Sequence, residues 1–327
     1  MMTHRIAVAV GAGAAAALLF AVSATTSALA MALAYLAPLP IMIATVGWGL
    51  DAGAIAVAVS IAGIAALGGP LQALAYAASV AAPSWLLAAF AATPLHKYLF
   101  GWWRSAPTYA SLGAVVTLAA FIGMAGAAAV LTSLIFVYRG YEHAVHQVSA
   151  ALAEVAGEAL DLGVDAEPVK EIVNALLQWG PAAIAASTLL MLCVNLYAAG
   201  RSTQLSQNLA RPWPDVPTSL ALPWPLGVVA LACVVGALEL PPPLSQYVSI
   251  GAGGLGGAFA LQGLAVAHAL SRGLKLRPVM LIALYLCCIL RAKYTLPVLA
   301  ALGVIDAFTR LRVRAAIHPS PHPKPQK

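Results

Sequence analysis

The side chains in this sequence that are best suited to chemistry are the few polar residues that interrupt its long apolar runs. A polar group inside a bilayer is costly, so such residues are usually kept where they bind, conduct or pair. Those expected near the outer face are Gln72, Tyr76, Glu239, Gln246, Tyr247, Arg291 and Lys293, and Gln262 lies close to the middle. All of these except Glu239 are candidate solute-binding residues. Amides, phenols and two cations, without a carboxylate at the midplane, predict binding of a small solute and disfavour a proton-driven carrier.

A second set of polar residues is expected near the inner face. It comprises Asp51, Asn195, His268 and Asp306. Asp306 lies four residues before Arg310, a spacing at which opposite charges pair on a helix, so a local ion pair is its simplest explanation. A membrane enzyme acting on lipid would have to use Asp51 or His268, and this is a third alternative for the function.

Sequence motifs of common enzyme classes are missing. The sequence holds no HExxH zinc site, no GxSxG nucleophile elbow and no Walker A loop. GAGGLG at 251–256 matches the dinucleotide fingerprint in its letters, but it lies inside an apolar run instead of after a strand, which favours close helix packing. We therefore expect no catalytic residue, no metal and no cofactor.

The composition indicates an integral membrane protein. Of 327 residues, 62% are hydrophobic and 9% are charged, against about 25% charged residues in soluble domains, and the mean hydropathy is +0.90. A spanning helix needs about 20 apolar residues. The expected fold is all-α and polytopic, with eight to ten transmembrane helices near 5–24, 28–48, 52–68, 71–92, 108–137, 180–200, 223–240, 246–271, 274–290 and 294–309.

The basic residues predict the orientation of these helices. With the N-terminus in the cytoplasm, all of the 17 Lys and Arg residues except Arg139, Lys170, Arg291 and Lys293 fall on the inner side, as the positive-inside rule requires. This places both termini in the cytoplasm of a bacterial cell, with the protein in the inner membrane. The run from Ile6 to Ser23 is longer than a signal-peptide core, so we expect an uncleaved first helix.

One polar insert divides the apolar chain. Apolar residues step by three and four from Tyr141 to Leu162, and the pattern resumes from Val169, which predicts an amphipathic αα-hairpin outside the membrane. The expected units are transmembrane helices in 1–138, the extracytoplasmic hairpin in 139–179, transmembrane helices in 180–310 and a disordered, basic cytoplasmic tail in 311–327.

The second predicted helix contains two prolines, Pro38 and Pro40, in the sequence APLP. Each removes a helical N–H and disfavours the helical form of the preceding residue, so about one turn should be irregular. Lipid offers no partner for the freed carbonyl groups. The break is therefore expected to face protein or water, as a hinge or as the edge of a binding site.

Two segments are candidates for docking a partner. Ala7, Gly11 and Ala15 form a small-xxx-small face on the first helix, which either packs inside the molecule or docks another membrane protein. Arg211 and Trp213 lie in the inner loop LARPWPD at 209–215, which is either a rigid connector at the headgroups or a contact for a cytoplasmic partner.

Several stretches together carry a family resemblance. They are LAYLAPLPIMIATVGWG at 33–49, GGPLQAL at 68–74, APSWLLA at 82–88, NLYAAGRSTQLSQNLARPWPDVP at 195–217, LQGLAVAHAL at 261–270 and LGVIDAF at 302–308. With them, the chain resembles the YybS-like, DUF2232 group of bacterial membrane proteins, whose function is undefined. The N-terminal half of that group is distantly similar to the substrate-binding S-components of energy-coupling factor transporters. The resemblance implies solute capture near the outer face and docking through small residues, although an S-component has fewer helices.

Two functions from different classes follow. The first is a transport-related protein that binds a small solute from outside, and the alternative is an envelope scaffold that contacts partners through the hairpin and the inner loop. The expected partners are the lipid bilayer, an unknown small-molecule ligand and, for the transport function, a membrane coupling protein. Nucleic acid is not expected, because the basic residues are explained by membrane orientation.

Overall fold

A computed structural model describes residues 2–24, 27–94, 109–161, 166–207, 209 and 212–317 of the chain. Within these ranges every regular element is helical. The N-terminal elements are α1 (Met2–Ala21), η1 (Val22–Ala24), α2 (Ala28–Tyr35), α3 (Pro38–Trp48), α4 (Leu50–Tyr76), η2 (Ala77–Ala81) and α5 (Ala82–Ala92). The central ones are α6 (Leu112–Val137), α7 (Tyr141–Asp161) and α8 (Ala166–Leu205). The C-terminal ones are α9 (Val216–Ser219), α10 (Trp224–Glu239), α11 (Leu244–Leu270), α12 (Arg277–Leu290), α13 (Ala292–Thr309) and α14 (Leu311–Ile317).

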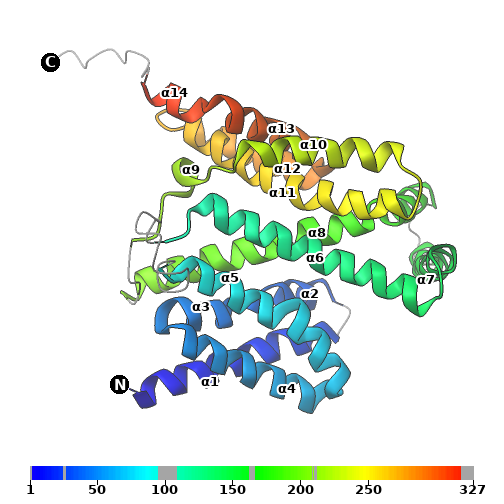
Figure 1. Ribbon diagram of the computed structural model, residues 1–327, viewed down its shortest axis with the longest axis horizontal. Helices are drawn as coiled ribbons and strands as arrows, with labels where there is room; N and C mark the ends of the chain where they lie inside the picture. The colour runs from blue at the N-terminus through cyan, green and yellow to red at the C-terminus, as the bar shows by residue number, and fades with distance from the viewer. Residues whose placement is uncertain are drawn as a thin grey trace, which may run out of the picture.

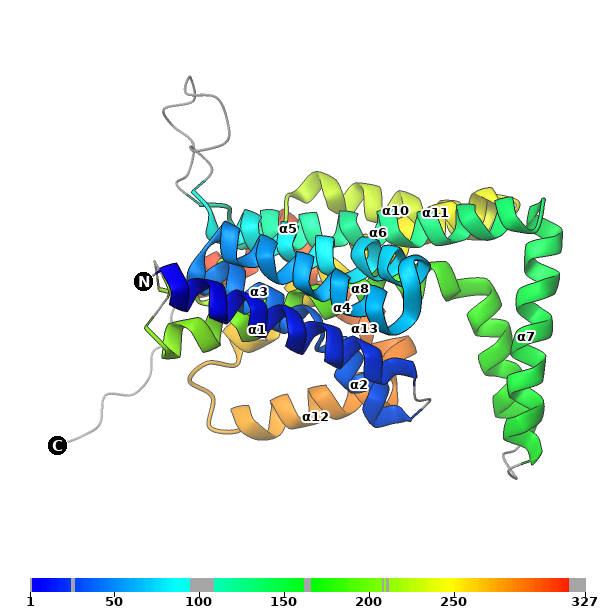
Figure 2. The same cartoon turned by 90° about the horizontal axis from the view of Figure 1, so that it is seen from below.

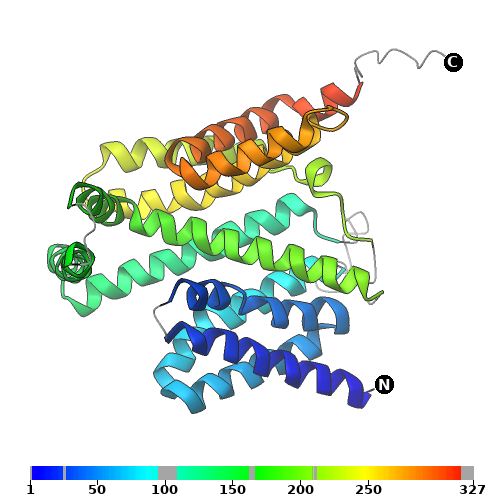
Figure 3. The same cartoon turned by 180° about the vertical axis from the view of Figure 1, so that it is seen from behind.

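The expectation of an all-α polytopic membrane protein is confirmed. Seven helical segments in the described chain are long and apolar enough to span a membrane, and α10 and α12 are shorter apolar helices. One of the seven, Leu50–Ala92, doubles back on itself: Gly69 inside α4 has φ +84°, and Figure 3 shows the chain reversing before it continues into α5. Each of the ten predicted apolar segments is therefore helical for most of its length.

The helices form three tiers, as Figure 1 shows. The α1–α5 tier is followed by α6 and α8, and then by α10–α14. Buried residues of α1, α3, α4 and η2 form one apolar core, and a larger core joins α3, α5, α6, α8 and α11. The first residues of α1 and the helix α14 lie at one end of the bundle, the termini end, and α7 lies at the opposite end, the hairpin end.

The predicted αα-hairpin is present as α7 and the first part of α8. The boundary expected at residue 180 falls inside one continuous helix, since α8 runs from Ala166 to Leu205. Pro181 lies inside this helix, and Figure 2 shows α8 bending as it leaves the hairpin, which runs across the direction of the other helices. A proline inside a helix commonly causes such a bend.

Small residues set the closest helix contacts. A side chain at Gly253 would overlap the backbone of Ala182 in α8, and one at Gly254 would overlap Met124 in α6. Both glycines belong to GAGGLG, so this motif packs helices and the interpretation of it as a packing motif is confirmed.

The tail prediction needs correction. Residues Leu311–Ile317, expected to be disordered, form α14, and the side chain of Arg312 is held in a buried network described below. The remainder of that predicted tail lies outside the described residues.

Candidate functional site

The proline break lies at the predicted position but is shorter than the expected turn, and its two residues keep right-handed helical angles. α2 ends at Tyr35 and α3 begins at Pro38, so the irregular part is Leu36 and Ala37. The two prolines occupy the first turn of α3, where backbone N–H groups have no hydrogen-bond acceptor within the helix. The break is buried on the side of Ala37 and Pro38, and the expectation that it faces protein is confirmed.

Asn195 of α8 satisfies the carbonyl group that the break releases. Its Nδ2 donates to the Tyr35 carbonyl oxygen at 2.8 Å and to the Met191 carbonyl oxygen at 2.8 Å. Because Tyr35 lies partway along the apolar segment Ala28–Trp48, Asn195 lies deeper in the bundle than the inner-face position expected from the sequence.

The other end of the Asn195 amide has no such partner. Asn195 is 2% exposed, and its Oδ1 accepts no hydrogen bond from any described residue. A buried acceptor without a donor costs about 1–3 kcal/mol, so a water molecule or a ligand is expected to complete it. A shallow hollow lined by Ser23, Met31, Ala34 and Tyr35 lies on the α2 side of the break.

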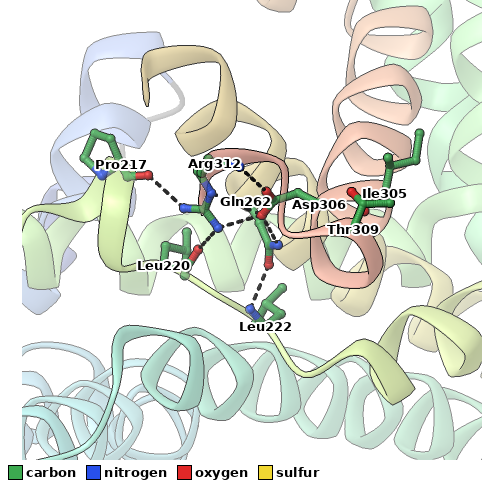
Figure 4. Close-up of polar contacts among 8 residues, drawn as sticks. All are labelled: Pro217, Leu220, Leu222, Gln262, Ile305, Asp306, Thr309 and Arg312. Atoms are coloured by element: carbon green, nitrogen blue, oxygen red, sulfur yellow. Dashed lines mark hydrogen bonds and ion pairs between the residues drawn. The ribbon is translucent and has the colours of Figure 1, made fainter. Parts of the chain in front are cut away.

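A second polar centre lies at the termini end and is drawn in Figure 4. Asp306 of α13 is 3% exposed and pairs with Arg312 of α14, whose Nη2 and Nε lie 2.7 and 3.1 Å from Asp306 Oδ2. Gln262 of α11 donates from Nε2 to the same oxygen at 2.8 Å and accepts at Oε1 from the Leu222 backbone N–H at 2.8 Å.

Arg312 extends this network to the loop around α9. Its Nη1 donates to the Pro217 carbonyl oxygen at 2.7 Å, and its Nη2 donates to the Leu220 carbonyl oxygen. The network therefore joins α11, α13, α14 and the segment before α10 at one point (Figure 4). Its hydrogen-bonding groups serve one another, which suits a structural clamp better than a binding site.

The predicted partner of Asp306 was wrong. The ion pair involves Arg312 instead of Arg310, because Arg310 has the left-handed conformation, φ 55° and ψ 45°, and ends α13. The turn directs the following residues back toward Asp306. Gln262, expected to contact a solute, is instead fully engaged in the same clamp.

The structure does not gather the remaining predicted solute-binding residues into one site. Tyr76 is fully buried against Phe20, at 4.7 Å between ring centroids, and its hydroxyl has no hydrogen-bond partner in the described chain. Gln72 is exposed beside Gly68 at the turn of α4. Arg291 and Lys293 are exposed at the junction of α12 and α13, with Lys293 Nζ 5.2 Å from the centroid of the Tyr294 ring.

Gln246 and Tyr247 lie at the start of α11, beneath the hairpin. Tyr247 shares a 2.8 Å hydrogen bond with Thr132 of α6. Gln246 contributes to a separate, half-open cavity between α6, α7 and α8. Of the residues predicted to bind solute, Gln246 alone lines one of the described cavities.

The small-residue face of α1 points away from the bundle. Ala7 and Gly11 are exposed and Ala15 is half-buried, whereas Gly13 on the opposite face packs against the Ala56 carbonyl oxygen of α4. The alternative that this face packs inside the molecule is therefore wrong. Its use in docking a partner stays a prediction.

Of the two loop residues predicted to dock a partner, only one is described. Trp213 folds back onto α8, where its ring occupies the space beside Gly200, and Arg211 lies outside the described residues. In the same loop, Asp215 forms an exposed 2.7 Å ion pair with Arg272. Hydrogen bonds from Arg272 and Thr218 lower the pKa of Asp215.

Sequence reasoning missed the roles of Asn195 and Arg312. Asn195 was recognised as an intramembrane polar residue, but its partner lies 160 residues away in the chain. Arg312 was one of several basic residues after α13, and no local signal distinguishes it from Arg310 or Arg314.

Comparison with protein families gives one match. A family model described as "Predicted membrane protein (DUF2232)" matches residues 14–307. No curated protein and no solved structure matches the chain significantly.

Proposed function

Because the chain belongs to the DUF2232 family of predicted membrane proteins, we propose that it is a transport-related protein, and not an enzyme, that binds a small solute. The observation that carries this proposal is the interrupted helix α2–α3 packed against Asn195. Transporters commonly form their solute sites where membrane helices are interrupted. The free acceptor of Asn195, 2% exposed, offers a donor-bearing solute a hydrogen bond that the described protein does not supply.

Replacing Asn195 tests the proposal. Wild-type protein in lipid nanodiscs is screened by thermal shift against a panel of vitamins and metabolites. We expect at least one compound to raise Tm, and Asn195→Leu to weaken its binding about tenfold, as expected when one buried hydrogen bond is lost. Val194→Leu, at the exposed neighbouring position, should bind normally. A panel without any shift, together with no co-purifying coupling protein, counts against solute binding.

The proposal includes an orientation: both termini in the cytoplasm and the hairpin outside, in a bacterial inner membrane. Its support is the excess of Lys and Arg in the segments at the termini end. Green fluorescent protein fused after Lys327 should fluoresce, and alkaline phosphatase inserted between Asp161 and Ala166 should be active. The reverse pattern would show that the protein is inverted.

A scaffold is the second candidate, and the hairpin favours it. Val155, Ile172 and Leu176 are 62%, 59% and 44% exposed on α7 and α8, so these apolar side chains are available for contact with a partner. Removing residues 139–178 separates the two functions. A scaffold should lose its crosslinked partners, whereas a solute binder should keep its affinity.

In the transport function, the outward face of Ala7, Gly11 and Ala15 is the proposed contact for a membrane coupling protein. Closely approaching helices use small residues in this pattern. Gly11 has no neighbouring atom within 4 Å of the position of a Cβ, so Gly11→Leu should leave folding intact and reduce co-purification of that protein.

A further inference from the structure

The cavity beneath the hairpin has chemistry that the solute site proposed at Asn195 does not use. It encloses about 150 Å³ between α6, α7 and α8, and Gln246 of α11 closes one side. Among the described lining residues only Tyr141 and Gln246 carry polar side chains. A cavity of about this volume lined by aliphatic groups holds a benzene-sized molecule in another protein. An apolar body of about six to eight heavy atoms therefore fits.

One buried acceptor at this cavity has no donor among the described residues. Gln246 Oε1 is buried and receives no hydrogen bond from the described residues. A ligand that donates hydrogen bonds would therefore be favoured over a purely apolar one.

The charges around the cavity select against anions. No charged side chain is among the described lining residues, and Glu142 follows Tyr141 directly. The pKa of Tyr141 lies above its ordinary value of 10, mainly because the phenol is partly buried. A hydrogen bond with the Gln246 amide offsets part of this rise, and the negative charge of Glu142 adds to it. The phenol is thus neutral at physiological pH. An anion would lie near the Glu142 carboxylate with no cation in the described lining to offset the repulsion, whereas a neutral alcohol or an ammonium group avoids it.

We propose that this cavity is a binding site for a small amphiphile with one aromatic or short alkyl group and a neutral or cationic hydrogen-bond donor. The apolar group occupies the space between α6, α7 and α8, and the donor faces Gln246. The site is independent of Asn195, so either can exist without the other.

The experiment uses the full chain in nanodiscs of fixed lipid composition with four probes of equal ring size: benzyl alcohol, benzylamine, toluene and benzoate. Thermal shift is measured for the wild type and for two variants in which an alanine of α7 is replaced by leucine. Ala144→Leu fills the cavity at a lining position that is 4% exposed, and Ala151→Leu adds the same atoms at an exposed position. Probe partitioning into lipid affects all of these proteins equally, so their differences report the site.

We expect benzyl alcohol and benzylamine to raise Tm of the wild type and of Ala151→Leu, and to have no effect on Ala144→Leu. Gln246→Leu should weaken benzyl alcohol about three- to tenfold relative to toluene, which corresponds to one lost hydrogen bond. Equal shifts in all variants, no shift in the wild type, or a preference for benzoate would overturn the proposal. So would native mass spectrometry that finds a phospholipid retained by the wild type and lost in Ala144→Leu, because a lipid chain would then fill the cavity.

Discussion

Arg312→Met is expected to lower the free energy of unfolding by about 3–5 kcal/mol. The substitution leaves Asp306, 3% exposed, without its ionic partner. It also removes the donors to the carbonyl oxygens of Pro217 and Leu220. Reversible unfolding in mixed micelles, followed by tryptophan fluorescence, measures the loss.

The matched control is Arg314→Met, on the same short helix but exposed. Removing an exposed arginine should change the free energy of unfolding by no more than about 0.5 kcal/mol. Asp306→Asn combined with Arg312→Met should be less destabilised than Arg312→Met alone, because no unpaired charge stays buried. A loss below about 1 kcal/mol for Arg312→Met would mean that the pair is open to water, and the network would then not be a clamp.

Such a clamp bears on the proposed transport function. It fixes the α9 loop to α11, α13 and α14 at the termini end, while the interrupted helix and the hairpin cavity lie toward the middle and the other end of the bundle. A buried ion pair has two states, made and broken, and bistable contacts of this kind underlie many conformational changes.

Local features of the fold were predictable because their causes are local. Apolar segments of about 20 residues form membrane helices. The break at Pro38 follows from the covalent structure of proline, and so does its need for a partner, since lipid has none to offer. The amphipathic pattern of the hairpin likewise depends on residues three and four apart.

The contacts between helices were not predictable in the same way. Ala and Gly cover every face of α1, so the sequence does not distinguish the packed residue Gly13 from the outward residue Gly11. Asp306 and Arg310 have the spacing of a helical ion pair, but the helix ends at Thr309 and the pair forms with Arg312. The first outcome depends on tertiary packing, and the second depends on the backbone conformation of Arg310. Neither is specified by the local sequence.

The second large effect is expected at the contact of α11 with α13. Gly263 lies against the Leu299 carbonyl oxygen, and Gly303 lies against the Phe259 carbonyl oxygen, so that each helix places a glycine on the backbone of the other. A Cβ at either position would overlap a backbone atom, which has no rotamer by which to move away. Gly263→Leu and Gly303→Leu should therefore each cost about 3 kcal/mol or more, at or above the upper end of ordinary overpacking.

Gly256→Leu is the matched control for this pair, since it lies on α11 with no neighbouring atom within 4 Å of its Cβ position. It should leave the free energy of unfolding nearly unchanged. The double variant Gly263→Leu/Gly303→Leu should cost less than the sum of the single losses, because the first substitution already separates the helices. Separation also moves Gln262, next to Gly263, away from Asp306. Additive losses in the double variant would instead show that the two glycines pack independently.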